Sequence, residues 1–206
     1  MQPPDEGAIL LDGRPVHLDT PKAAKAAGIE TVYQDLALCD NLDVTANLFL
    51  GRELRRGLLG PLLAVFDKAR MNRDAQALFD RLNIEIPSLR TAVRHLSGGQ
   101  RQSIAIAKAV YGKARVLIMD EPTAALGVVQ TEKVLRLVRD LCASGIAVIY
   151  ISHIMEDVFK VADRMVVLKN GRRVGERLAG ETDRDEVVRM MITGVDERAH
   201  GGEAAR

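Results

Sequence analysis

The sequence predicts an α/β protein built around a parallel sheet. Two short apolar runs, Val116–Met119 and Ile146–Ile151, have the composition of strands buried on both faces. Between them, Thr131–Cys142 repeats apolar residues at helical spacing. Because parallel strands need a long crossover connection, usually a helix, this order of elements favours a parallel sheet.

The composition argues against several classes of protein. Of the 206 residues, 47% are hydrophobic and 28% are charged, as in globular domains with a normal core. The net charge of +1 and the aromatic content of 3% give no support for nucleic-acid binding. The chain has no apolar run near the ~20 residues of a membrane span, and residues 1–6 do not resemble a signal peptide. We therefore expect a cytoplasmic protein without a nucleic-acid partner.

The first forty residues are expected to form a hairpin, a helix and one strand. The dipeptide Asp12-Gly13 is typical of a tight hairpin turn, because both residues tolerate positive φ angles. Thr20 is a typical helix N-cap, and Pro21 suits the first helical position. The expected elements are a hairpin over 8–18, a helix over Pro21–Ala27 and a strand over Ile29–Tyr33, after which comes Gln34.

A small helical subdomain is expected next, over about residues 41–110. Helical patterns cover Asn41–Gly51 and Asp67–Leu82. The basic, glycine-containing stretch Arg52–Gly60 between them is interpreted as a solvated loop, and Asn83–Thr91 as a linker.

A glycine-containing motif, Leu96-Ser97-Gly98-Gly99-Gln100, opens the helix that continues to Val110. Ser97 and Gln100 have the spacing of a capping box. The glycines cost helix stability, about 1 kcal/mol each relative to Ala. Close approach of a phosphate to the free N–H groups of the helix start would explain them. The alternative is a well-capped helix with a glycine-rich entry loop.

Polar side chains follow both apolar strands. Asp120, Glu121 and Pro122 come directly after the first, where open α/β sheets bind ligands. Ser152 and His153 follow the second. The alternatives are a polar turn closed by a proline and a structural histidine.

The C-terminal part is expected to form a second hairpin and a last helix. Asn170-Gly171 is a strong turn signal between Met165–Leu168 and Arg173–Gly175. Thr182 is expected to open the helix, with Gly194 at its end. The remaining residues, 195–206, are expected to form a flexible tail.

Together, these motifs resemble those of the ATP-binding cassette (ABC) ATPases. Gln34, LSGGQ at 96–100, VLIMDEP at 116–122 and His153 have the order and spacing of that family, and the resemblance covers nearly the whole chain. It implies a P-loop NTPase-like (RecA-like) parallel sheet core, with a small helical subdomain and an N-terminal β-hairpin. It also implies a single ABC ATPase domain over residues 1–194.

The resemblance assigns roles to individual residues. Ser97, Gly98, Gly99 and Gln100 match the signature motif, which grips the γ-phosphate of ATP held by the opposite subunit of a head-to-tail dimer. Asp120 matches the carboxylate that holds Mg²⁺ through water, and Glu121 matches the general base. His153 matches the residue that contacts the γ-phosphate. Gln34 matches the glutamine that senses metal and phosphate and links the site to a membrane partner.

These residue types also suit phosphoryl transfer, which needs a metal, donors around the phosphate oxygens and a group that orients water. Within the family, the segments around Gln34 and Glu121 are similar to importers of simple sugars of the ribose, xylose and fructose type. The implied function is to energise carbohydrate import with ATP and Mg²⁺, at the cytoplasmic face of the membrane. The implied partners are membrane permease subunits, a second ATPase subunit and, indirectly, an extracytoplasmic sugar-binding protein.

Two features depart from the family pattern. Gly127 stands where many cassettes have an aspartate that touches the opposite subunit. The phosphate-binding (Walker A) pattern G-x-x-x-x-G-K-[ST] is absent from the 206 residues, and the only Gly-Lys pair is Gly112-Lys113. The first puts cross-talk between the two sites through that carboxylate in doubt, and the second leads us to expect an amino-truncated cassette. Two functions stay open at this point: an ATP hydrolase, and a catalytically inactive cassette that only binds a permease or a partner cassette.

We predict that the 206-residue chain binds Mg-ATP weakly. A phosphate loop supplies several backbone hydrogen bonds of about 1 kcal/mol each and a lysine contact of roughly 1.5 to 3 kcal/mol. Losing about 4 to 6 kcal/mol lowers affinity by on the order of a thousandfold or more. Titration calorimetry measures this directly, and a low-micromolar Kd would contradict the prediction.

Overall fold

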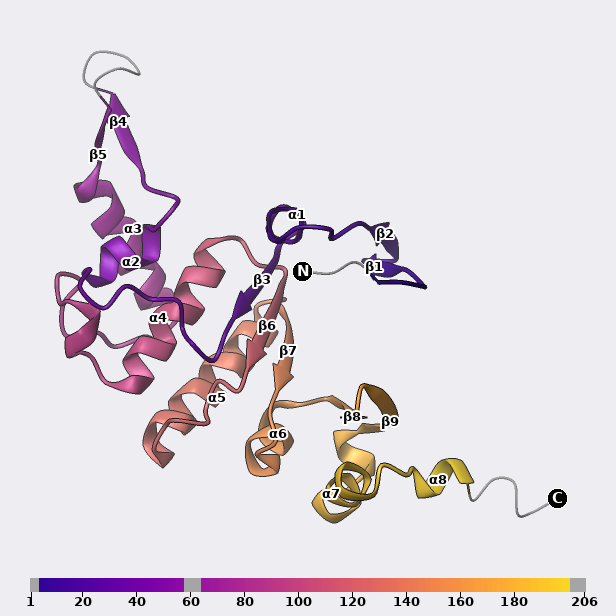
Figure 1. Ribbon diagram of the computed structural model, residues 1–206. Helices are drawn as coiled ribbons and strands as arrows, with labels where there is room; N and C mark the ends of the chain where they lie inside the picture. Colours follow the sequence, from indigo (N-terminus) through magenta and orange to yellow (C-terminus); the bar gives the residue numbers. More distant parts are fainter. Residues whose placement is uncertain (1–3, 58–63, 201–206) are drawn as a thin grey trace. The chain divides into compact units, whose positions relative to one another are not determined.

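A computed structural model describes residues 4–57 and 64–200 (Figure 1). The chain divides into two compact units, Met1–Ile151 and Ser152–Arg206, each described here by itself. Unit one contains β1 (Ile9–Leu11), β2 (Arg14–Val16), α1 (Pro21–Ala26), β3 (Ile29–Val32), α2 (Val44–Phe49), β4 (Arg55–Gly57), β5 (Ala64–Phe66), α3 (Lys68–Arg81), the 3-10 turn η2 (Val93–His95), α4 (Gly98–Tyr111), β6 (Val116–Asp120), α5 (Val128–Ala143) and β7 (Ala147–Ile151). Unit two contains α6 (Met155–Val161), β8 (Arg164–Lys169), β9 (Arg172–Leu178), the 3-10 turn η3 (Ala179–Glu181), α7 (Arg184–Thr193) and α8 (Glu197–His200).

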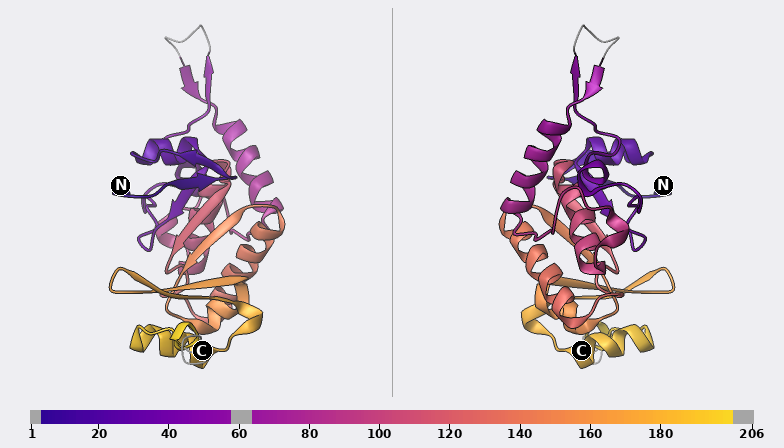
Figure 2. Two further views of the ribbon diagram at one scale, coloured as in Figure 1. Left: turned by 90° about the vertical axis from the view of Figure 1, so that its right-hand side faces the viewer. Right: turned by 90° about the vertical axis from the view of Figure 1, so that its left-hand side faces the viewer.

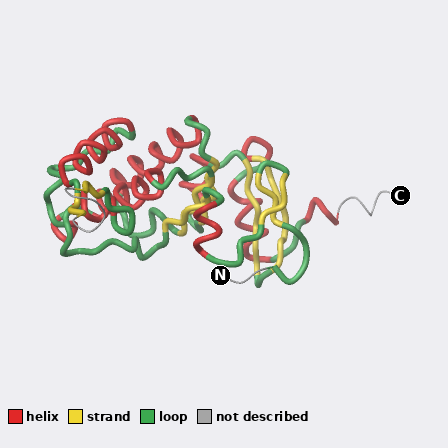
Figure 3. The backbone as a smooth tube through the Cα atoms, turned by 90° about the horizontal axis from the view of Figure 1, so that it is seen from above, coloured by secondary structure: helices red, strands yellow, loops and turns green. Residues whose placement is uncertain are grey.

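The centre of unit one is a parallel sheet in the order β3-β6-β7. The predicted α/β class with a parallel sheet is therefore confirmed. Leu117 and Met119 of the middle strand are completely buried. Helices α4 and α5 pack against each other, with α4 also contacting β3 and α5 contacting β7. Figure 3 distinguishes these helices (red) from the strands (yellow).

The prediction that Ile146–Ile151 is buried on both faces is wrong. The strand begins at Ala147, and the side chains of Ile149 and Ile151 are 50% and 46% exposed. The reason is that one face of the sheet is incompletely covered. Ile149 and Ile151 lie on this face, and so does Ile118 of the central strand, which is only partly buried. Apolar composition alone does not reveal which face of a sheet stays uncovered.

The predicted N-terminal hairpin and first helix are confirmed. Asp12 and Gly13 form the turn with φ angles of 51° and 73°. The Thr20 hydroxyl accepts a hydrogen bond from the Ala23 N–H at 3.1 Å, and Pro21 occupies the first helical turn.

Helices α2, α3 and α4 of unit one enclose an apolar cluster. Phe49 of α2 and Phe79 of α3 are almost completely buried, and both helices contact α4. Helix α2 is shorter than the predicted Asn41–Gly51, because Asp43 caps it by accepting a hydrogen bond from the Ala46 N–H at 2.7 Å.

The interpretation of Arg52–Gly60 as a solvated loop is wrong for residues 55–57. Arg55–Gly57 forms β4, which pairs antiparallel with β5. The pairing continues at the base of the hairpin, where the Asp67 N–H donates to the Leu54 carbonyl at 2.8 Å. Residues 58–60 lie outside the described part of the chain. Strands β4 and β5 have only three residues each and are separated in the sequence. Periodicity over a few neighbouring residues therefore could not predict that they pair.

Unit two is a β8–β9 hairpin with α7 packed on both strands. The predicted turn is confirmed, with φ angles of 50° at Asn170 and 74° at Gly171. The N-cap of α7 is Asp183 rather than the expected Thr182, whose hydroxyl instead donates to the Glu186 carboxylate at 2.7 Å.

A buried arginine organises unit two. The Arg177 side chain is only 8% exposed and donates to Asp196 at 3.0 Å and to Glu186 at 2.8 Å. Its hydrogen bond with Asp196 raises the pKa of Arg177, which therefore stays charged. The sequence predicts a flexible tail from residue 195, yet Asp196 takes part in this network, α8 follows it, and residues 201–206 lie outside the described range.

We predict that Arg177→Ala lowers the free energy of unfolding of unit two by about 3 kcal/mol, because it leaves two carboxylates without their buried partner. Hydrogen exchange of the α7 amides measures the loss. The control is Arg189→Ala, which removes an ion pair whose side chains are 56% and 67% exposed and should change stability by less than about 1 kcal/mol. Equal effects of the two variants would contradict the prediction.

Candidate functional site

The parallel register brings two groups of predicted site residues to one edge of the sheet. Val32 lies opposite Met119, so Gln34, two residues past Val32, and Asp120, the last residue of β6, both lie at the carboxyl end of their strands. Asp120 in turn lies opposite Ile151, the last residue of β7. This is the edge at which open α/β sheets bind ligands.

Glu121 adopts an unusual backbone conformation. Its φ angle is +47°, in the left-handed region that residues with a Cβ rarely occupy. Two contacts hold this turn against β7. The Glu121 N–H donates to the Ile151 carbonyl at 2.9 Å, and the buried Thr123 hydroxyl lies 3.0 Å from the Tyr150 hydroxyl. Strained conformations maintained by their surroundings concentrate at functional sites.

Helix α4 begins with the predicted capping box. The Gln100 N–H donates to the Ser97 hydroxyl at 3.3 Å, and the Ser97 N–H donates to the Gln100 side-chain oxygen at 3.0 Å. These reciprocal bonds fix the start of the helix.

The glycines of α4 have a structural reason that the sequence did not reveal. A Cβ at Gly99 would lie 2.8 Å from Cγ and 2.9 Å from Cβ of Gln130 on α5, closer than such atoms approach. A Cβ at Gly98 would meet only the end of the Leu126 side chain, at 3.2 Å. Gly99 therefore lets α4 and α5 approach, so phosphate binding is not needed to explain it.

Helix α4 also contacts the segment after Gln34. The Lys108 ammonium donates to the Ala37 carbonyl at 3.4 Å, and Ala37 has a positive φ of 48°. Burial lowers the pKa of Lys108. One rigid helix thus links the capped start at Ser97 with the loop that carries Gln34.

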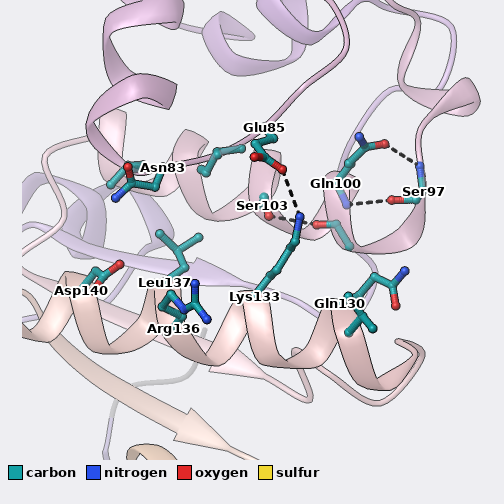
Figure 4. Close-up of a pocket in the computed structure, with 14 residues that line it drawn as sticks. Asn83, Glu85, Ser97, Gln100, Ser103, Gln130, Lys133, Arg136, Leu137 and Asp140 are labelled. Atoms are coloured by element: carbon teal, nitrogen blue, oxygen red, sulfur yellow. Dashed lines mark hydrogen bonds and ion pairs between the residues drawn. The ribbon is translucent and has the colours of Figure 1, made fainter.

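A cleft of about 520 Å³ lies beside the start of α4 (Figure 4). Lys133 of α5 crosses it to pair with Glu85 at 3.1 Å, and the Ser103 hydroxyl donates to the Gly99 carbonyl at 2.9 Å. Ser97, Gly99 and Gln100 line this cleft, whereas Gln34, Asp120 and Glu121 are not among its lining residues. Within unit one, the predicted residues therefore occupy two places, the edge of the sheet and the start of α4.

His153 belongs to unit two, two residues after the end of β7. Next to it, the Ser152 hydroxyl accepts a hydrogen bond from the Ile154 N–H at 3.1 Å, but the N-cap of α6 is Ile154, so the expectation that Ser152 caps this helix is wrong. The described residues contain no group of three or more His, Cys, Asp or Glu side chains that could hold a metal ion. A Mg²⁺ ion bound with a nucleotide fits Asp120 without such a group, because this ion takes one or two carboxylates and completes its shell with phosphate and water.

Sequence reasoning missed Thr123, Gln130 and Tyr150, which hold the Glu121 turn and the start of α4 in place. A hydroxyl on an otherwise apolar strand, as at Tyr150, was the one available signal.

Comparisons with known proteins identify the family of this chain. A family profile described as "ABC transporter" matches residues 1–124. The chain is 46% identical to the fructose import ATP-binding protein FrcA of Rhizobium meliloti, over 83% of the chain and 66% of that protein. It is 40% identical to the xylose/arabinose import ATP-binding protein XylG of Sulfolobus acidocaldarius, over 92% of the chain and 73% of that protein.

Solved structures show the same fold. The ATP-binding cassette MJ0796, in a dimeric post-hydrolysis state bound to ADP and Pi, matches 85% of the chain with a TM-score of 0.66 and 26% identity, over 75% of its own length. The chain belongs to the ABC transporter family of ATP-binding cassettes. It spans 66% of the Rhizobium relative and 36% of the ribose import ATP-binding protein RbsA of Rhodopirellula baltica.

We predict that Gly99→Ala destabilises unit one by about 1 to 3 kcal/mol, because the new methyl group overlaps Gln130. Gly98→Ala is the matched control and should cost less, since only the end of the Leu126 side chain must move. Urea unfolding compares the two variants. In a double-mutant cycle, Gln130→Gly, which removes both overlapping atoms, should recover part of the Gly99→Ala loss. Strictly additive effects would show that the Gly99–Gln130 contact is not responsible.

Proposed function

We propose that this chain is the ATP-binding and ATP-hydrolysing subunit of an ABC importer for simple sugars. The observation that carries the proposal is the arrangement at the carboxyl edge of the sheet, where Gln34 and the pair Asp120-Glu121 follow adjacent parallel strands. The names of the fructose, xylose/arabinose and ribose import proteins support the sugar assignment. In this proposal the ABC ATPase domain extends over residues 1–194, and its helical subdomain over about 41–110.

Each residue at the carboxyl end of the sheet, and His153 of unit two, has a role in this proposal. Asp120 holds Mg²⁺ through water, and Gln34 senses the metal and the phosphate. Glu121 accepts a proton from the attacking water, and the turn that fixes its backbone limits where its carboxylate can reach. His153 contacts the γ-phosphate. When bound, Mg-ATP would supply the phosphoryl group that is transferred, and its Mg²⁺ would neutralise negative charge on the phosphate oxygens.

The start of α4 contacts the nucleotide that is bound to the partner subunit. In a head-to-tail dimer, Ser97, Gly98, Gly99 and Gln100 present backbone N–H groups and a hydroxyl to ATP held by the partner cassette. The capping bonds of Ser97 and Gln100 support this role because they keep the helix start rigid. The dimeric state of the MJ0796 cassette supports a second ATPase subunit.

The remaining partners follow from the same proposal. Membrane permease subunits bind the cassette at the cytoplasmic face of the membrane, and an extracytoplasmic sugar-binding protein acts indirectly. No described helix is both long enough and apolar enough to cross a bilayer.

A second candidate is a catalytically inactive cassette that only binds a permease or a partner cassette. The 206 residues contain no phosphate-loop pattern, so the test of this alternative supplies one. The two candidates are distinguished by adding a phosphate loop to the chain and measuring ATP hydrolysis. Hydrolysis would show that the remaining site residues are functional, and its absence would favour the inactive cassette.

We predict that Glu121→Gln abolishes turnover in a fusion that places a strand and a G-x-x-x-x-G-K-[ST] loop ahead of Met1. The amide keeps the size of the side chain but cannot accept the proton, so the steady-state rate should fall at least about a hundredfold. ATP affinity should stay unchanged. The control is Glu85→Gln, which alters an exposed carboxylate away from the sheet edge. Hydrolysis by Glu121→Gln within threefold of the parent would rule out Glu121 as the base.

A further inference from the structure

A cavity of about 230 Å³ lies beside the loop that carries Gln34, within unit one. Helix α1 and strand β3 (indigo in Figure 2) contact each other, β3 also contacts α4, and all three elements contribute to the cavity lining. The cavity shares no lining residue with the cleft at the start of α4. The ATPase roles proposed above use none of the residues that line it. The apolar part of the lining includes Ala24, Leu36, Leu48, Ala105 and Ala109.

Positive charge dominates the polar part of this lining. Arg52 pairs with the buried carboxylate of Glu30, the one acidic side chain among the lining residues. Lys25 and Lys108 also line the cavity, and neither forms an ion pair with another described residue. With three cationic side chains and one carboxylate, the lining carries a net charge of +2. An anion is therefore the ligand whose charge complements this cavity.

The charge of Lys108 is only weakly compensated. Its side chain is half-buried, and its ammonium donates to the Ala37 carbonyl at 3.4 Å, which is long for a hydrogen bond. Burial lowers the pKa of Lys108, the nearby Lys25 and Arg52 lower it further, and negative groups offset this only in part. A partly buried cation without a close partner is unfavourable, and an anion bound beside it relieves this.

We propose that this cavity binds free inorganic phosphate, with the phosphate oxygens between the ammonium groups of Lys25 and Lys108. A phosphate group carries a charge of about −1.5 to −2 at pH 7, which matches the net charge of the lining. The cavity volume lies below the roughly 300 to 1,000 Å³ of pockets for drug-sized ligands, so it suits a small ion rather than a larger metabolite.

Phosphate bound in this cavity restricts the loop that carries Gln34. Tyr33, Leu36 and Ala37 flank Gln34 in the sequence, and all three line the cavity. The Ala37 carbonyl already accepts a hydrogen bond from Lys108, so an anion at Lys108 lies next to the loop backbone. This consequence rests on the proposed function, in which Gln34 senses metal and phosphate, whereas the binding itself does not.

The test is a phosphate titration of the full 206-residue chain, without nucleotide, followed through the amide NMR signals of Tyr33, Leu36 and Ala37. Potassium chloride keeps the ionic strength constant, so that screening does not change during the titration. We expect saturable shifts with a Kd of about 20 mM or lower. Lys25→Gln and Lys108→Gln should each raise this Kd about tenfold, because each removes a charge-assisted hydrogen bond.

Matched variants separate this site from general attraction of anions. Lys22→Gln removes one charge from an exposed position of α1 outside the cavity lining, and Lys133→Gln removes one beside the cleft at the start of α4. Both should bind phosphate like the parent. Lys25 is exposed, so Lys25→Gln keeps the test valid even where Lys108→Gln alters the loop.

Three results would overturn the proposal: shifts that do not saturate, saturable shifts that Lys25→Gln leaves unchanged, or an equal loss of affinity in Lys22→Gln and Lys25→Gln. A fusion with an added phosphate loop that fails to hydrolyse ATP, while phosphate binding stays normal, would refute only the proposed function. The reason is that binding in this cavity requires no ATP.

Discussion

The parallel register of β3, β6 and β7 is the constraint on which the rest of the candidate site depends. It places the carboxyl ends of three strands at one edge, so that Gln34 and Asp120 follow neighbouring strands although they are far apart in the chain. Burial of Leu117 and Met119 in the central strand stabilises this register, because a slip by one residue would turn both side chains to the opposite face. The geometry of the site is thus a consequence of core packing.

Helix α4 connects this edge to the second place where predicted residues gather. Its first turn is fixed by the capping box, its buried face packs on α5 through Gly99, and Lys108 reaches the loop after Gln34. Contacts at three points along one helix therefore connect its capped start with the loop after Gln34.

The β4–β5 hairpin and unit two show how charge is used in different ways in one chain. Arg177 is buried and fully bonded, and it orders the C-terminal segment through Asp196. Arg55 and Arg56 are exposed on the short strand β4, where the Arg55 guanidinium lies over the Phe66 ring. Burial therefore separates an arginine that holds the C-terminal segment from arginines whose charge stays in contact with solvent.

The sequence by itself determined the α/β class, the turns at Asp12-Gly13 and Asn170-Gly171, and the cap at Ser97, because turn chemistry, caps and helical periodicity act within a few residues. Motif spacing also indicated the ABC family, to which the chain belongs. Only the tertiary structure decided that β7 exposes apolar side chains and that Arg55–Gly57 is a strand. It also decided that the Glu121 backbone adopts the left-handed conformation, and that Gly99 allows close packing against Gln130. Each of these depends on contacts between segments distant in sequence, which local pattern does not encode.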